Sequence, residues 1–270
     1  MQLAFDHLVW FFKKPEEAIA PLEQVGLKVA PGGRHESWGT YNTLSYFGLS
    51  YLEFLGIEDW QRAETHEANR LITHIVEQLP KDNGEGPARI AIRTNEIEEL
   101  AKQLKQKGFT VYGPIPGERV RGDGEVIRWS LLFPEYAGSQ LRLPFFIQWE
   151  KSDEERLAEL KQQGLIDRHQ AGPVLFESVG FAVTQLDETL ALWERLLNLK
   201  AGEEFVTQEL NARCRKLTLA GTELLFCSPI GKGIVAVVLE EKGESPFLAN
   251  FSGTNQSRIF ELLNGHWSFK

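Results

Sequence analysis

FDHLVWFFKKPEEAIAPLEQVG, residues 5 to 26, is the stretch that decides the fold. Its apolar and aromatic first part, Phe5 to Phe12, is typical of a buried strand. Pro15 suits the first turn of a helix, and Gly26 suits its end. Three short apolar stretches follow, separated by turn residues, at Leu27 to Ala30, Tyr41 to Phe47 and Tyr51 to Ile57. The sequence therefore predicts a unit of one strand, one helix and three strands, written βαβββ.

This unit repeats along the chain. A second copy is predicted from Ala88, with its helix at Glu96 to Lys107, and a third from Phe176, with its helix at Asp187 to Leu197. The C-terminal residues predict an incomplete fourth unit, with a first strand at Ile234 to Glu241 and a helix at Gln256 to Leu263. Each predicted helix is followed by three strands joined by short turns, whereas a doubly wound parallel sheet needs a helix between successive strands.

The repeat sets the expected fold class, which is α+β. We expect the βαβββ modules to form curved mixed sheets around a cavity, with the helices outside. Residues 1–150 are expected to hold two paired modules, residues 151–172 a helical linker, and residues 173–270 the third module with the incomplete fourth. In the linker, Ser152 with Glu155 three residues later predicts a capped helix start.

Composition excludes several classes of function. The 270-residue chain has 29 Lys and Arg against 38 Asp and Glu, a net charge of −9, so it lacks the basic surface that nucleic-acid binding needs. Its longest aliphatic run, Ile234 to Leu239, is far shorter than the roughly 20 residues of a membrane span. Two cysteines, Cys214 and Cys227, are too few for a disulfide framework, which indicates a reducing cytoplasm.

Short motifs in the first two units carry a family resemblance. The first unit contains Asp6-His7-Leu8-Val9, Pro31-Gly32-Gly33-Arg34-His35, Trp38-Gly39-Thr40, Asn42 and Tyr51-Leu52-Glu53. The second contains Arg119, Arg121, Asp123-Gly124, Trp129, Leu143-Pro144-Phe145-Phe146-Ile147 and Trp149. In their order and spacing, these motifs resemble the vicinal oxygen chelate superfamily, and within it the large glyoxalase-like domain group. Relatives in that superfamily include glyoxalase I, extradiol dioxygenases and bleomycin resistance proteins.

The resemblance implies a divalent-metal site. Family modules offer one ligand from the first strand and one from the last, and His7 and Glu53 stand at those places here. Strand alternation puts His7 on one face with Phe5 and Val9, so both ligands can point into one cavity. Imidazole and carboxylate suit Zn, Ni, Mn or Fe. His7 and Glu53 are therefore the expected metal ligands and catalytic residues, with Glu53 also able to shuttle a proton.

The ligand set is incomplete in the second unit. Ile90 or Ala91 stands where a first-strand histidine would fall, and Phe146 or Ile147 stands near the last-strand acid. His35, which follows two glycines, is an alternative third ligand that would complete a set of two histidines and one carboxylate, and it is equally a solvated loop residue.

Other polar and aromatic residues of these motifs are expected to bind substrate. Arginine recognises carboxylate or phosphate oxygens bidentately, and indole rings supply apolar walls. The predicted substrate-binding residues are Arg34, His35, Trp38, Asn42, Arg121 and Trp129.

Two classes of function stay open. One is a metal-assisted lyase, isomerase or dioxygenase that acts on a small anionic or carbonyl metabolite. The other is a metal-free protein that sequesters a drug or toxin, as the bleomycin resistance relatives do, and the apolar residues of the second unit favour it. In both, the partner is a small molecule rather than a nucleic acid or a membrane, and a homodimer is compatible with either. A scaffold with a vestigial cavity is a third hypothesis.

Overall fold

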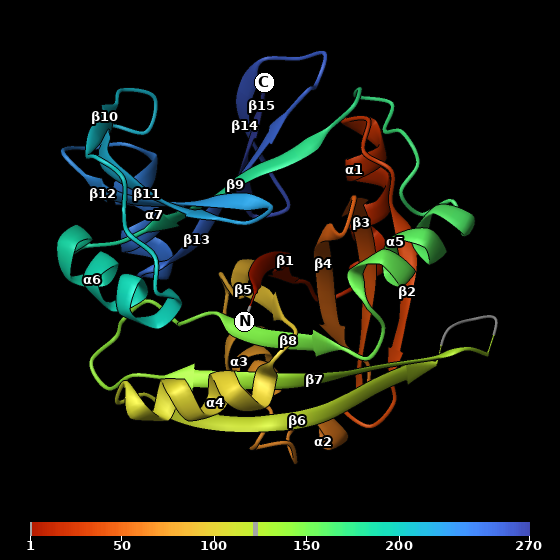
Figure 1. Cartoon of the computed structure of the whole chain (residues 1–270). Coiled ribbons are helices and arrows are strands. Elements are labelled where there is room, and N and C mark those ends of the chain that lie inside the picture. Colours follow the sequence, from red (N-terminus) through yellow and green to blue (C-terminus); the bar gives the residue numbers. More distant parts are fainter. Residues whose placement is uncertain (1, 121–123) are drawn as a thin grey trace.

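The first two βαβββ modules close into a barrel in a computed structural model that describes residues 2–120 and 124–270 (Figure 1). The strand order is β1-β4-β3-β2-β6-β7-β8-β5. Strand β1 lies parallel to β4 of its own module and antiparallel to β5, the first strand of the next. The strands are β1 (Leu3–Phe11), β2 (Ala30–His35), β3 (Thr40–Phe47), β4 (Ser50–Ile57), β5 (Gly86–Thr94), β6 (Thr110–Val120), β7 (Val126–Glu135) and β8 (Phe145–Trp149).

Short helices surround the barrel, and the one at residues 70–78 packs Leu71, Ile72 and Ile75 against the apolar residues of the barrel interior. In α4, an apolar face formed by Ile97, Leu100 and Leu104 is buried, as the 3.6-residue period of an amphipathic helix requires. The start of α5 has the predicted capping box, in which Ser152 and Glu155 each accept a hydrogen bond from the other's backbone N–H. The helical segments are η1 (Pro15–Ala18), α1 (Ile19–Gln24), α2 (Trp60–Ala63), α3 (Arg70–Gln78), α4 (Ile97–Gln106) and α5 (Asp153–Gln162).

The C-terminal part of the chain builds a second, open sheet. Its order is β10-β11-β12-β9-β13-β15-β14. Strand β13 runs antiparallel to β9, as β5 does to β1. The elements are β9 (Leu175–Ala182), α6 (Leu186–Leu197), β10 (Phe205–Thr207), β11 (Ala212–Leu219), β12 (Thr222–Pro229), α7 (Ile234–Lys242), β13 (Ser245–Ser252), β14 (Arg258–Leu262) and β15 (Gly265–Phe269).

The sequence prediction for the fourth unit was wrong in its elements. Residues 234–242 form helix α7, not a strand, and the predicted helix at Gln256 to Leu263 contains strand β14. A short continuous apolar run does not distinguish a buried helix from a strand. In α7, Val235 and Val238 are one turn apart and both buried, so the helix is held by packing on one side. The first strand of the fourth unit is β13.

Aromatic packing joins the barrel to the second sheet. The Trp10 ring lies 5.1 Å from that of Trp267, and Phe47 lies 4.8 Å from Phe251. The Trp10 indole also donates a hydrogen bond to the Leu263 carbonyl at 2.7 Å. All of these rings belong to one buried cluster that spans both sheets. The predicted α+β class, with curved sheets and outer helices, is confirmed.

Across residues 2–120 and 124–270, no helix is long and apolar enough to span a membrane.

Candidate functional site

His7 of β1 and Glu53 of β4 meet inside the barrel. The His7 Nε2 and Glu53 Oε2 atoms are 3.4 Å apart, and both side chains are buried. Tyr51, two residues before Glu53 on the same face of β4, stacks its ring on the His7 imidazole at 4.4 Å. The prediction that strand alternation brings His7 and Glu53 to one cavity is therefore confirmed in its geometry.

Asp6 fixes the other side of the His7 ring. Its Oδ1 atom lies 2.8 Å from His7 Nδ1, while its Oδ2 accepts a hydrogen bond from the Trp149 indole at 2.9 Å. Arg156, at the mouth, is 3.5 Å from the same Oδ2. The pairing of β1 with β5 shifts between Phe5 and His7, which marks a bulge at Asp6. Because of this bulge, Phe5 packs in the outer cluster, not on the face of His7 as the alternation predicted.

Asn42 of β3 holds the second oxygen of Glu53. The Asn42 amide donates to Glu53 Oε1 at 2.5 Å, and its own Oδ1 accepts the Gly33 N–H at 2.9 Å. A β-carbon at Gly32 would overlap Asn42 Oδ1, so the strand can approach this closely only with glycine there. The Gly32-Gly33 pair, predicted as a turn, instead lies within β2 and positions Asn42.

The site is charged in spite of its burial. Burial opposes the charge on Glu53, but the hydrogen bond and positive charge of His7 outweigh it and lower the Glu53 pKa to about 2. Burial also opposes charge on His7, but hydrogen bonds to Asp6 and Glu53 raise its pKa to about 9. For Asp6, burial is outweighed by the charge of Arg156 and the His7 hydrogen bond, which lower the pKa to about 2. At neutral pH, an imidazolium therefore stands between two carboxylates.

A neutral, aromatic side of the cavity faces His7 and Glu53. His35 and the indole rings of Trp38 and Trp129 form a cluster with centroids 5.7 to 5.8 Å apart. His35 Nδ1 lies 3.0 Å from the Thr40 hydroxyl. Burial, together with the nearby charges of Arg119 and His7, lowers the His35 pKa to about 4. His35, Trp38, Asn42 and Trp129, which were predicted to bind substrate, all line the inner cavity.

One of the two predicted arginines faces away from the cavity. Arg34 points out of the barrel and pairs with Glu58 at 2.9 Å, because successive residues of a strand face opposite sides and His35 takes the inward position. Arg121 lies outside the described residues. Arg128 is an exposed residue that pairs with Glu118 at 3.3 Å.

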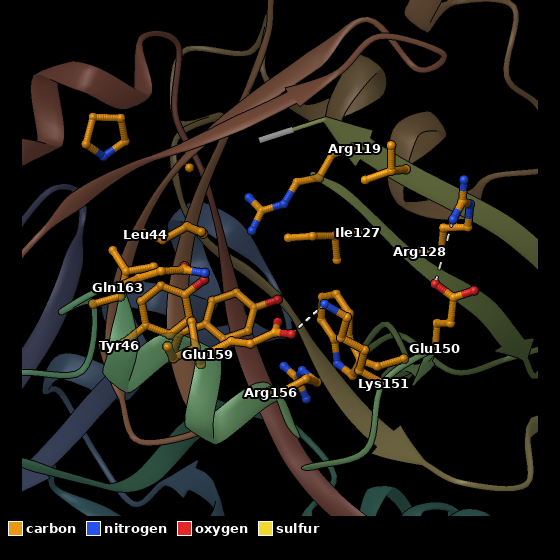
Figure 2. Close-up of a pocket in the computed structure, with 17 residues that line it drawn as sticks. Leu44, Tyr46, Arg119, Ile127, Arg128, Glu150, Lys151, Arg156, Glu159 and Gln163 are labelled. Atoms are coloured by element: carbon orange, nitrogen blue, oxygen red, sulfur yellow. Dashed lines mark hydrogen bonds and ion pairs between the residues drawn. The ribbon is translucent and has the colours of Figure 1, made fainter. Parts of the chain in front are cut away.

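Arg119 instead supplies the positive charge inside the site. It lies where an inner cavity of about 40 Å³, which contains His7 and Glu53, adjoins an outer cavity of about 300 Å³. Figure 2 shows Arg119 reaching into the outer cavity from β6, across from Arg156 of α5. Across the described residues, Arg119 forms no ion pair, while Arg128, Lys151 and Arg156 all pair with carboxylates. Its guanidinium is thus available to a ligand.

Comparison with known proteins identifies the family at this point. A sequence model described as "Glyoxalase-like domain" matches residues 5–197, which include all of the barrel except the first two residues of β1, and the start of the second sheet. The chain belongs to the glyoxalase-like domain family. No curated protein matches this glyoxalase-like protein.

Solved structures share its fold. The crystal structure of a hypothetical protein from Staphylococcus aureus matches with a TM-score of 0.80 at 22% identity, over 99% of each chain. A mutant of 4-hydroxymandelate synthase from Streptomyces coelicolor matches with a TM-score of 0.59 at 11% identity, over 93% of this chain and 71% of that one. The glyoxalase-like protein therefore has the vicinal oxygen chelate fold.

The donor atoms in this glyoxalase-like site do not complete a metal centre. His7 and Glu53 are two donors, whereas open catalytic sites use three protein ligands. On the second-module side, Ala91 pairs with His7 and the Phe145 ring lies 5.5 Å from the imidazole, and neither has a donor atom. Across residues 2–120 and 124–270, no three His, Cys, Asp or Glu side chains are grouped to hold an ion. The residues present do not fit the metal that the family resemblance implied.

Three functional residues were not among the predicted site residues. Asp6 stood in the Asp6-His7 motif, but its role depends on a bulge that the sequence does not reveal. Arg119 had a usable signal, because it stands in the same second-unit motif from which Arg121 was chosen. Arg156 lies in the linker helix and is 3.5 Å from Asp6 Oδ2, 150 positions away in sequence, so no local signal indicates the contact.

Proposed function

We propose that this glyoxalase-like protein binds a small carbonyl compound bearing an anionic group and transfers a proton at the carbon next to the carbonyl. The observation that carries the proposal is the buried His7–Glu53 pair, with 3.4 Å between Nε2 and Oε2, at the inner end of a cavity that contains a free arginine. The inner cavity is small and admits the reactive end of the ligand. Any longer substituent extends into the outer cavity.

Glu53 and His7 have complementary roles in this reaction. The Glu53 carboxylate removes the proton from the carbon, and the electron pair of the broken C–H bond forms the enolate double bond. As the ligand enters, the Nε2–H of the His7 imidazolium turns from Glu53 to the ligand and donates a hydrogen bond to the oxygen on which negative charge develops. Asp6 keeps the imidazole oriented and charged. Return of the proton from Glu53 to another position gives an isomerase, and departure of a neighbouring group gives a lyase.

Arg119 recognises the anionic group. It stands at the junction of the two cavities, so a carboxylate on it places the neighbouring carbonyl in the inner cavity. Within residues 2–120 and 124–270 Arg119 has no carboxylate partner, and such a guanidinium gives a charge-assisted and often bidentate contact to an anion. The charge of Arg119 also helps to keep His35 neutral, so that the aromatic wall does not repel His7.

A second function is sequestration without chemistry. The apolar side of the cavity, with Trp38, Trp129 and Phe145, would hold a ligand by burial of its surface alone. In that case a ligand binds and is released unchanged. The two functions share a cavity and differ in whether Glu53 accepts a proton.

Binding of 2-oxobutyrate tests ligand recognition. Calorimetry is expected to show saturable binding of 2-oxobutyrate and much weaker binding of butan-2-one, which has the carbonyl but no carboxylate. Arg119→Gln is expected to weaken 2-oxobutyrate binding by about tenfold or more, because a charge-assisted hydrogen bond contributes about 1.5–3 kcal/mol. The matched control is Arg128→Gln, since Arg128 lines the outer cavity but pairs with Glu118 and Glu150. Equal losses in both variants, or equal binding of the two compounds, would contradict anion recognition by Arg119.

A further inference from the structure

The second sheet repeats the strand pairing that builds the site in the barrel. In the barrel, His7 of β1 pairs with Ala91 of β5. In the second sheet, Ser178 of β9 pairs with Asn250 of β13, which in turn pairs with Ser268 of β15. Ser178 thus occupies the position of His7, and Asn250 that of Ala91. Polar residues stand in the second sheet where the second barrel module has apolar ones.

Helix α7 covers only one end of this second concave face. Val235 and Val238 pack with Cys214, Cys227 and Leu248 in a separate apolar cluster. The other end is a cavity of about 560 Å³, which contains Ser178, Asn250 and Ser268. The second pair of modules therefore has an open cavity of its own, apart from the barrel.

The floor of this cavity is polar and buried. The Asn250 amide donates to the Ser178 hydroxyl at 2.7 Å, and Ser178, Asn250 and Ser268 are 5%, 4% and 2% exposed. The strand pairing shifts between Asn250 and Phe251, opposite Glu177, so Glu177 reaches the same cavity as its neighbour Ser178. Within the described chain, the Glu177 Oε2 atom is buried and has no hydrogen-bond partner. A buried carboxylate oxygen without a donor is costly and is satisfied when a ligand supplies one.

The rim of the cavity is acidic. Glu203, Glu209 and Glu223 join Glu177 there, against Lys216 and Lys270. Lys216 already forms an ion pair with Glu223. The outer cavity of the barrel has the opposite arrangement, with an arginine that is unpaired among the described residues, so the two cavities select ligands of different charge.

We propose that this second-sheet cavity binds a small hydroxylated amine. The Glu177 side chain turns its unpartnered carboxylate toward the cavity as the ligand enters and accepts a hydrogen bond from the ammonium group, and the ligand hydroxyls exchange hydrogen bonds with Asn250 and Ser268. This site does not depend on the function proposed for the barrel, because it shares no lining residue with the barrel cavities.

Glucosamine and glucose form a matched pair of probes, since they differ by one ammonium group in place of a hydroxyl. Titration of the full chain, followed by calorimetry and by saturation-transfer NMR, is expected to show saturable binding of glucosamine in the millimolar range or below and at least about tenfold weaker binding of glucose. Glu177→Gln is expected to remove most of this preference, and Asn250→Ala to weaken binding of both sugars. Glu98→Gln, an exposed change on α4 outside the second sheet, is the control and leaves both affinities unchanged.

Three results of these titrations decide whether the second-sheet cavity binds a hydroxylated amine. Absence of saturable glucosamine binding up to about 10 mM, or equal affinity for the two sugars, overturns the proposal. So does a glucosamine preference that survives in Glu177→Gln, provided that far-UV circular dichroism shows the variant folded. If Glu177→Gln fails to fold, a loss of glucosamine binding in Asn250→Ala supports the proposal, and unchanged binding overturns it.

Discussion

His7 Nε2 and Glu53 Oε2 lie 3.4 Å apart with side chains only 4% and 8% exposed, while His7 Nδ1 lies 2.8 Å from Asp6. The imidazolium is thus held between two carboxylates in the barrel interior. Burial disfavours charges individually, so the three groups keep their charge only as a set.

The pKa of His7 is therefore the first quantity to measure. We expect histidine NMR to give a pKa of about 9, raised against burial by hydrogen bonds to Asp6 and Glu53. Glu53→Gln removes one of the two negative charges and is expected to lower the pKa of His7 by a unit or more. A His7 pKa near the usual 6.5 in the unmodified protein would contradict the charged arrangement.

The pH dependence of the free energy of unfolding above pH 6.5 follows from the raised pKa of His7. Because the His7 pKa is raised on folding, its contribution is fully present below the unfolded value of 6.5 and is lost as pH rises through about 9. The free energy of unfolding should fall by about 3 kcal/mol over this range, the equivalent of a shift between those two pKa values. Urea denaturation measures this free energy of unfolding. In His7→Gln, it should change little between pH 6.5 and about 9.

Below pH 6.5, His35 makes the free energy of unfolding fall as pH is lowered. Its pKa is lowered to about 4 by burial and by the charges of Arg119 and His7, so the stability from its neutral form is present above 6.5 and is lost as pH falls toward 4. Urea denaturation between pH 6.5 and 5 should show declining stability in the unmodified protein. His35→Gln should reduce that slope; an unchanged slope would assign the decline to other groups.

Asp6→Asn tests how far the negative charge of Asp6 stabilises the charged His7 imidazole. The substitution leaves His7 and Arg156 without their shared negative charge in a buried place, and breaking such a pair costs about 3 kcal/mol or more. Chemical denaturation at pH 7 measures the loss. Asp82→Asn, at an exposed position, is the control and should change stability by less than about 0.5 kcal/mol.

Gly32→Ala tests the positioning of Glu53 through Asn42. A methyl group at residue 32 displaces Asn42 Oδ1, so Glu53 loses an amide donor and its pKa rises. We expect weaker 2-oxobutyrate binding and a lower His7 pKa, both measured by NMR. Gly202→Ala is matched to it because a β-carbon there meets only the Lys216 carbonyl at 3.7 Å. Similar effects of both substitutions would show that Asn42 is not the cause.

Alternation and repetition explain which features were predictable. The βαβββ pattern brings His7 and Glu53 to one cavity because the period of two holds from His7 to Val9 on β1 and along β4. Alternation failed at Phe5, where a bulge moves the side chain to the outer cluster. It also shows why Arg34 was a poor candidate, since its neighbour His35 faces inward.

Other features depend on contacts between distant segments. Arg156 reaches Asp6 across 150 positions of sequence, and nothing local to either residue indicates the contact. Helix α7 was predicted as a strand because Ile234 to Leu239 is apolar at every position, and its packing against β12 and β13 decides its conformation. The glycines at 32 and 33 indicated a turn, whereas the structure uses them for close approach to Asn42.

Proton transfer at Glu53 can be observed through deuterium exchange. With 2-oxobutyrate in D₂O, proton NMR follows the loss of the C3 hydrogen signal. We expect the unmodified protein to accelerate this loss well above the buffer rate, and Glu53→Gln to return it to the buffer rate while still binding the compound. Exchange that is no faster with the protein than without it, or equally fast in Glu53→Gln, would contradict a role for Glu53 as the base.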